Sequence, residues 1–115
     1  MKEDFDRLLC CEGAADLEEF LGHGERARSI FQQCTDEVRA SGARLQGNRG
    51  WARVLRMWAL FEKRQGEYQA SQRLFAEAAK AWPLDSRTWL HWGLLERRLS
   101  DWDRARRILQ HGVKV

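Results

Sequence analysis

The second half of the sequence repeats itself at a fixed offset, the step from Trp58 to Trp92. One repeat unit begins at Trp58 and reads W-A-L-F-E-K-R-Q-G-E-Y, and the next begins at Trp92 and reads W-G-L-L-E-R-R-L-S-D-W, with no gap in the alignment. Aromatic, acidic and basic residues fall in matching columns. A period of about 34 residues is typical of a repeat built from two helices, and such repeats stack into a solenoid. The repeat therefore predicts an all-α chain of antiparallel helix pairs.

Hydrophobic periodicity divides the chain into six expected helices, or three pairs. The helices are expected over residues 3–21, 25–40, 49–65, 67–82, 86–99 and 101–112, with a break possible at residues 13–15. The first two align with the last two at an offset of 78, which is twice the repeat offset of 34 plus 10. Residues 1–42 are therefore interpreted as a degenerate first pair, 43–50 as a linker with an insertion, 51–84 as the second repeat and 85–115 as the third.

Helix-capping and helix-breaking residues predict where the helices of the second and third repeats begin and end. Asn48 is expected to cap one helix, and Asp85 or Ser86 another, because their side-chain oxygens can accept a hydrogen bond from a free backbone N–H. Gly66 is expected to end a helix. Pro83, the single proline, is expected to stop the fourth helix and to force the preceding residue into an extended conformation.

Charge is unevenly distributed along the chain. Residues 1–50 hold 7 basic and 10 acidic residues, whereas residues 51–115 hold 13 basic and 7 acidic residues. The repeat region is thus a basic module behind a mildly acidic segment, which permits an anionic partner. The three cysteines, Cys10, Cys11 and Cys34, form no CxxC pair, and an odd count without a signal peptide fits an intracellular, reducing compartment. No leader is visible, and no apolar run is long enough to span a bilayer.

The repeat columns resemble a known family. Residues of the expected types occupy Trp58, Glu62, Phe75, Pro83, Trp89, Trp92, Gly93, Glu96 and Ala105. This pattern resembles the tetratricopeptide (TPR) repeat, but glutamate stands where that family usually has a tyrosine. It is closer to the half-a-TPR (HAT) variant, which occurs chiefly in RNA-processing proteins. In character the chain is most similar to chloroplast transcript-maturation factors that combine HAT and TPR features. The resemblance implies a role in RNA processing, in the nucleus or a plastid.

The same resemblance implies that the first helix of each pair lines a concave groove. Residues opposite the packed stripe are predicted to face it: Arg53, Arg56, Leu60, Lys63, Arg64, Arg87, Leu90, His91, Leu94, Arg97 and Arg98. A row of cations can follow the phosphates of single-stranded RNA. Two alternatives remain open: the groove binds a peptide or helix of a partner protein, or the cations form solvated helix faces with i,i+4 partners.

No motif predicts catalysis, a cofactor or a metal site. The sequence holds no Ser/His/Asp grouping and no glycine-rich phosphate loop, and its three histidines stand alone. Glu62 and Glu96 are instead predicted to be partly buried structural carboxylates that need a donor. Arg106 is expected to serve Glu96 and Gln72 to serve Glu62, with an indole N–H or a backbone amide as the alternative donor.

The last expected helix remains apolar up to the end of the chain, where Ile108, Leu109, Val113 and Val115 follow one another. Terminal repeats of solenoids normally carry a polar cap, because their stacking face is otherwise exposed. We therefore expect further repeats or self-association through the C-terminal helix.

Overall fold

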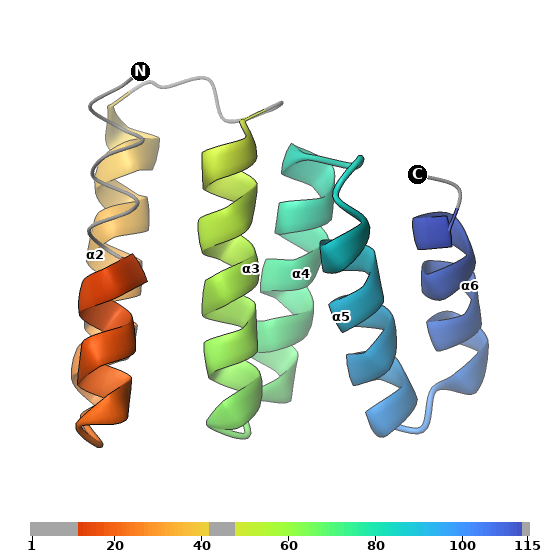
Figure 1. Ribbon diagram of the computed structural model, residues 1–115, viewed down its shortest axis with the longest axis horizontal. Helices are drawn as coiled ribbons and strands as arrows, with labels where there is room; N and C mark the ends of the chain where they lie inside the picture. Colours follow the sequence, from red (N-terminus) through yellow and green to blue (C-terminus); the bar gives the residue numbers. More distant parts are fainter. Residues whose placement is uncertain (1–11, 42–47, 114–115) are drawn as a thin grey trace.

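The computed structural model describes residues 12–41 and 48–113 of the 115-residue chain. These residues form six helices and no strand, which confirms the all-α class. The N-terminal helix, described over residues 12–20, is followed by α2 (Gly24–Ala40), α3 (Arg49–Arg64), α4 (Tyr68–Ala81), α5 (Ser86–Arg98) and α6 (Trp102–Val113). Consecutive helices run in opposite directions (Figure 1). Residues 3–11 of the first expected helix, residues 43–47 of the expected linker, Cys10, Cys11 and Val115 lie outside the described residues.

Capping residues set the helix boundaries, and Asn48 and Asp85 lie where the sequence predicts caps. Side-chain oxygens of Asn48, Asp85 and Asp101 each accept a hydrogen bond from a backbone N–H two or three residues further along, at 3.0–3.1 Å. Gly66 adopts a positive φ of 81°, a conformation that costs glycine little. Trp82, which precedes the proline, leaves the helix with φ −143° and ψ 85°. The N-terminal helix continues through residues 13–15, so the described part has no break there.

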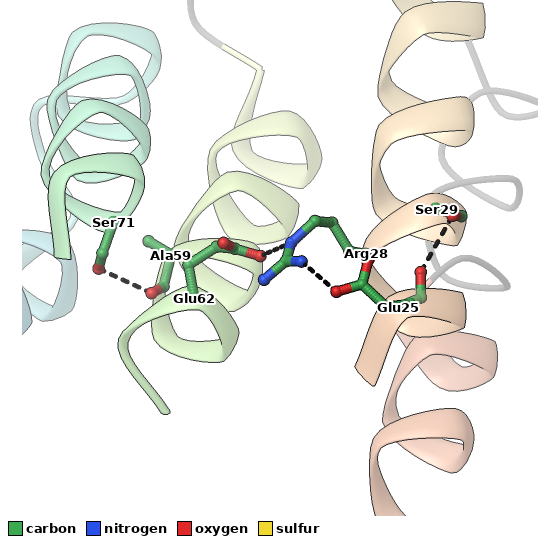
Figure 2. Close-up of polar contacts among 6 residues, drawn as sticks. All are labelled: Glu25, Arg28, Ser29, Ala59, Glu62 and Ser71. Carbon is green, nitrogen blue, oxygen red and sulfur yellow. Dashed lines mark hydrogen bonds and ion pairs between the residues drawn. The ribbon is translucent and has the colours of Figure 1, made fainter. Parts of the chain in front are cut away.

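The core lies between neighbouring helices of the row seen in Figure 1, where α3 packs against α4, α4 against α5, and α5 against α6. The largest fully buried side chains are Trp51, Phe31, Phe61, Phe75, Leu55 and Leu95. Small residues allow close approach within a pair. The buried hydroxyl of Ser71 donates to the backbone carbonyl of Ala59 at 2.7 Å, across α3 and α4 (Figure 2).

Two glycines allow the equivalent approach between α5 and α6. A Cβ atom at Gly93 would lie 2.5 Å from Cγ of Leu109, and a Cβ atom at Gly112 would lie 2.7 Å from Cβ of Trp89. Neither position has room for a larger side chain without movement of its neighbour. The small residue expected at Gly93 is therefore required by packing.

The tryptophans serve mainly as packing elements. Trp58 stacks on Phe31 with ring centroids 5.9 Å apart, and Trp89 stacks on Trp92 at 5.6 Å. Trp102 differs, because 60% of its surface is exposed. Among the described helices, none is long and apolar enough to cross a membrane.

Candidate functional site

Glu62 is a structural carboxylate held by the preceding helix pair. Its side chain is only 4% exposed, and its Oε1 accepts a hydrogen bond from Nε of Arg28 on α2 at 2.8 Å (Figure 2). Arg28 also contacts Glu25 at 2.9 Å. The hydrogen bond to Glu62 raises the pKa of the Arg28 guanidinium above its ordinary value. The prediction that Gln72 serves Glu62 is therefore wrong, because the donor comes from the preceding pair.

Glu96 has the corresponding arrangement one pair later. Its side chain is 1% exposed, and its Oε1 accepts from Nε2 of Gln72 on α4 at 2.8 Å, with Nε of Arg104 3.8 Å away. Arg106, the expected partner, is exposed on α6 instead. The indole N–H groups of Trp58 and Trp92 have no hydrogen-bond partner within the described residues, so they do not serve these carboxylates.

Two of the predicted groove cations form ion pairs with the N-terminal helix. Arg64 binds Glu19 through two hydrogen bonds of 2.7 Å, and Nε of Arg53 lies 3.2 Å from the Glu12 carboxylate. Both arginines remain partly exposed. The hydrogen bonds to Glu19 raise the pKa of Arg64. These two positive charges are therefore compensated within the chain.

Arg56 differs most from the expectation of an open groove residue, because it is buried, with 8% of its surface exposed. Its Nη1 binds Oδ2 of Asp85 at 2.6 Å. The same oxygen accepts from the hydroxyl of Thr88, while Oδ1 caps α5. Arg56 thus joins α3 to the N-terminus of α5. Its position opposite the packed stripe of α3 is covered by the next pair.

Arg97 and Arg98 at the end of α5 lie over aromatic rings. The guanidinium of Arg97 is 5.7 Å from the ring centroid of Trp102, and that of Arg98 is 5.7 Å from the ring centroid of Tyr68. Both arginines are exposed. A cation over an aromatic face remains charged and accessible, so these two side chains can still contact an anion.

The remaining three predicted residues, Lys63, Arg87 and His91, lie on α3 and α5 and are here called the cationic cluster. Burial lowers the pKa of His91, and the positive charges of Arg56, Lys63 and Arg87 lower it further, while Asp85 opposes them. These charges therefore act on one imidazole from two helices. No hydrogen bond or ion pair joins the side chains of Lys63 and Arg87 to the other described residues. Lys63 and Arg87 therefore carry positive charges that form no ion pair with a carboxylate of the described residues.

Leu90 and Leu94, also predicted to face the groove, are exposed to 48% and 38%. Leu90 lies in a hollow of about 300 Å³ together with Leu109 and Gly112 of α6. It therefore belongs to the side of α5 that faces α6 and the C-terminal end of the helix row. The repeat offset aligns Leu90 with Arg56, but only the structure shows that the next pair covers Arg56.

No family model matches this chain, and no curated protein matches it. The resemblance to HAT repeats consequently rests on the columns of the sequence and stays a prediction.

Proposed function

We propose that the chain is a non-catalytic HAT/TPR-type solenoid segment of RNA processing or transcript maturation, and that it binds single-stranded RNA on the first helices of its pairs. The observation that carries this proposal is the cationic cluster of Lys63, Arg87 and His91, whose lysine and arginine hold no carboxylate among the described residues. A phosphate placed there would pair with the positive charges of Lys63 and Arg87. The exposed Arg97 and Arg98 further along α5 extend the positive surface.

Binding on this surface is electrostatic in the first place. Each phosphate contact releases a counterion, so affinity falls with salt by about 0.7 log units per contact for each log unit of salt. Because the pKa of His91 is lowered, the imidazole is largely neutral near pH 7 and can donate or accept a hydrogen bond. A bound phosphate would favour its charged form and draw a proton onto it.

A protein-binding scaffold is the second candidate function. The observation that favours it is the compensation of Arg53, Arg56 and Arg64 by carboxylates of the chain. Because these three arginines are already paired with carboxylates, few cations of the row are free to bind a ligand. Such a surface suits a short acidic segment of a partner protein better than a long polyanion.

The test compares two double variants with the same change in net charge. Lys63→Glu with Arg87→Glu alters the cationic cluster, and Arg73→Glu with Arg107→Glu alters exposed positions on α4 and α6. Arg56 is left intact, because a glutamate there would be buried against Asp85. Fluorescence anisotropy with a labelled single-stranded RNA is measured at two salt concentrations.

The RNA proposal predicts that the cluster variant loses about tenfold or more in affinity, whereas the control loses about threefold or less. Because two phosphate contacts are removed, the slope of log affinity against log salt should flatten by about 1.4 in the cluster variant. Equal losses in both variants would show attraction by net charge alone. Absence of RNA binding by the unaltered chain at low salt would overturn the RNA proposal. Binding of an acidic peptide that the same cluster variant abolishes would then support the scaffold.

A further inference from the structure

One contact between helix pairs occurs twice in the same columns. Arg28 on α2 donates to Glu62 on α3, and Gln72 on α4 donates to Glu96 on α5, each at 2.8 Å. The two acceptors align at the repeat offset, and the two donors align once the insertion in the linker is allowed for. In both cases the second helix of one pair holds a buried glutamate of the next pair's first helix.

The donor position and the acceptor position each occur once more in the chain, and these two further residues lie at opposite ends of the helix row. Arg106 on α6 stands one repeat after Gln72 in the donor column, and Glu18 on the N-terminal helix aligns with Glu62 and Glu96 in the acceptor column. Arg106 is exposed. The side chain of Glu18 is 24% exposed, and its Oε2 contacts His23 at 2.7 Å. The described residues give the other oxygen of Glu18 no donor.

The apolar column beside the acceptor is exposed only at the N-terminal end. Leu17 aligns with Phe61 and Leu95 at the same offsets. Phe61 and Leu95 are 1% and 0% exposed, because the preceding pair covers them, whereas Leu17 is 57% exposed. Phe20, one turn further on, is 86% exposed. Leu17 is thus an exposed apolar side chain in a column that is buried elsewhere, which indicates a surface that is built to be covered.

The C-terminal end shows the complementary exposure. Leu109 aligns with Phe31 and Phe75, which are 1% and 0% exposed, but Leu109 itself is only partly buried. The ring of Phe31 lies 5.8 Å from that of Phe61 in the following pair. Leu109 therefore occupies the position that receives the apolar residue of a following pair.

We propose that the C-terminal end of one copy of this chain binds the N-terminal end of a second copy, head to tail. Arg106 then donates to Glu18 of the second copy, and Leu109 packs against Leu17 of the second copy, as Arg28 and Phe31 do with Glu62 and Phe61 inside the chain. Charge favours this pairing, because residues 1–50 carry a net −3 and residues 51–115 a net +6.

This contact uses two different surfaces, so it does not close on itself in a dimer. Each added copy leaves one free end of each kind, and growth continues into a filament unless the rotation between copies closes a ring. The proposal is independent of the proposed function, because neither Arg106 nor Glu18 belongs to the cationic cluster. Its failure would leave the RNA-binding test unaffected.

Sedimentation velocity of the chain across a wide dilution series tests the proposal. The unaltered chain is expected to form a ladder of species that lengthens with concentration and shortens with salt. Arg106→Glu and Glu18→Arg, each alone, should weaken association by about tenfold or more, because like charges then face each other. The matched control, Arg107→Glu, makes the same charge change at the neighbouring exposed residue of α6 and should weaken it by about threefold or less.

An equimolar mixture of the two charge-reversed variants gives the decisive result. In the mixture, the glutamate introduced at position 106 of one variant can face the arginine introduced at position 18 of the other. Association should therefore return to nearly the level of the unaltered chain. Circular dichroism of each variant establishes that it is folded. A monomer at every concentration, a dimer of fixed size, or a mixture that stays as weak as its components would each overturn the proposal.

Discussion

Replacing Arg28 with alanine removes the donor of the buried Glu62 carboxylate and leaves that charge unpaired. Glu62 is 4% exposed, whereas Arg28 is 29% exposed and reaches Glu62 from the neighbouring pair. Loss of one partner of a buried ion pair costs about 3–5 kcal/mol. Because removal of a partly exposed arginine lets water approach the carboxylate, we expect the lower end, about 3 kcal/mol. For a domain of this size that corresponds to a fall in Tm of about 10 °C.

Urea denaturation followed by tryptophan fluorescence and by circular dichroism measures this loss. The midpoint should fall with the slope of the unfolding free energy unchanged, since a change in slope would indicate a different unfolded or native state. Arg28→Gln should cost less than half as much as Arg28→Ala, because Gln72 already serves Glu96 in the same column at 2.8 Å. The glutamine variant thus tests whether a hydrogen-bond donor alone satisfies this site.

A second ion pair in the chain provides the matched control. Arg39 and Glu77 also join two helices, at 2.7 Å, but both side chains are 40% exposed. Glu62→Gln should cost about 1.5–3 kcal/mol, the range for a hydrogen bond to a charged group, whereas Glu77→Gln should cost about 1 kcal/mol or less. Equal losses at the two sites, or a loss below about 1 kcal/mol for Arg28→Ala, would refute the claim that burial sets the strength of the Arg28–Glu62 contact.

Two further predictions concern packing and pH. Gly93→Ala should lower the free energy of unfolding by about 1 kcal/mol, because the new Cβ lies 2.5 Å from Leu109 and this contact outweighs the better helix propensity of alanine. Gly13 has open space around it, so Gly13→Ala should raise the free energy of unfolding. Greater stability of both variants in thermal denaturation would contradict the packing argument. The lowered pKa of His91 means that the unfolded chain binds this proton more readily, so the His91 contribution is constant above about pH 6.5 and stability falls as the pH drops below that value. An NMR titration of the imidazole, or a smaller loss in His91→Gln between pH 8 and 5, checks this, and a midpoint at or above 6.5 would contradict it.

The local structure of this chain is predictable because its signals are local. Asn48 and Asp85 cap helices where their side chains predict caps, and Pro83 ends α4. These features depend on residues within one turn of each other, so a single sequence contains them.

Contacts between pairs are not predictable in this way, because alignment shows which residues share a column but not which columns meet. The alignment suggests Gln72 as the donor to Glu62 in the same helix pair. In the structure Gln72 donates instead to Glu96 in the next helix pair. Helical periodicity puts Arg56 opposite the packed stripe and so in an open groove. The N-terminus of α5, the first helix of the next pair, covers that position and binds Arg56 through Asp85. The leucine that replaces Arg56 one repeat later, Leu90, is the available sign that this column is not simply a basic strip.

Each of the two buried glutamates has one cation nearby. For Glu62 the cation belongs to the preceding pair, and for Glu96 it belongs to the same pair. Glu62 has Arg28 from the preceding pair, and the position of its own pair that corresponds to Arg104 is Ala70. Glu96 receives the neutral Gln72 from the preceding pair, and Arg104 of its own pair lies 3.8 Å away. Arg28 and Gln72 occupy equivalent repeat positions but differ in charge. Ala70 and Arg104 occupy a second pair of equivalent positions and also differ in charge. The positive charge lost where Gln72 replaces Arg28 is regained where Arg104 replaces Ala70. Each buried carboxylate therefore keeps a hydrogen-bond donor and a positive charge.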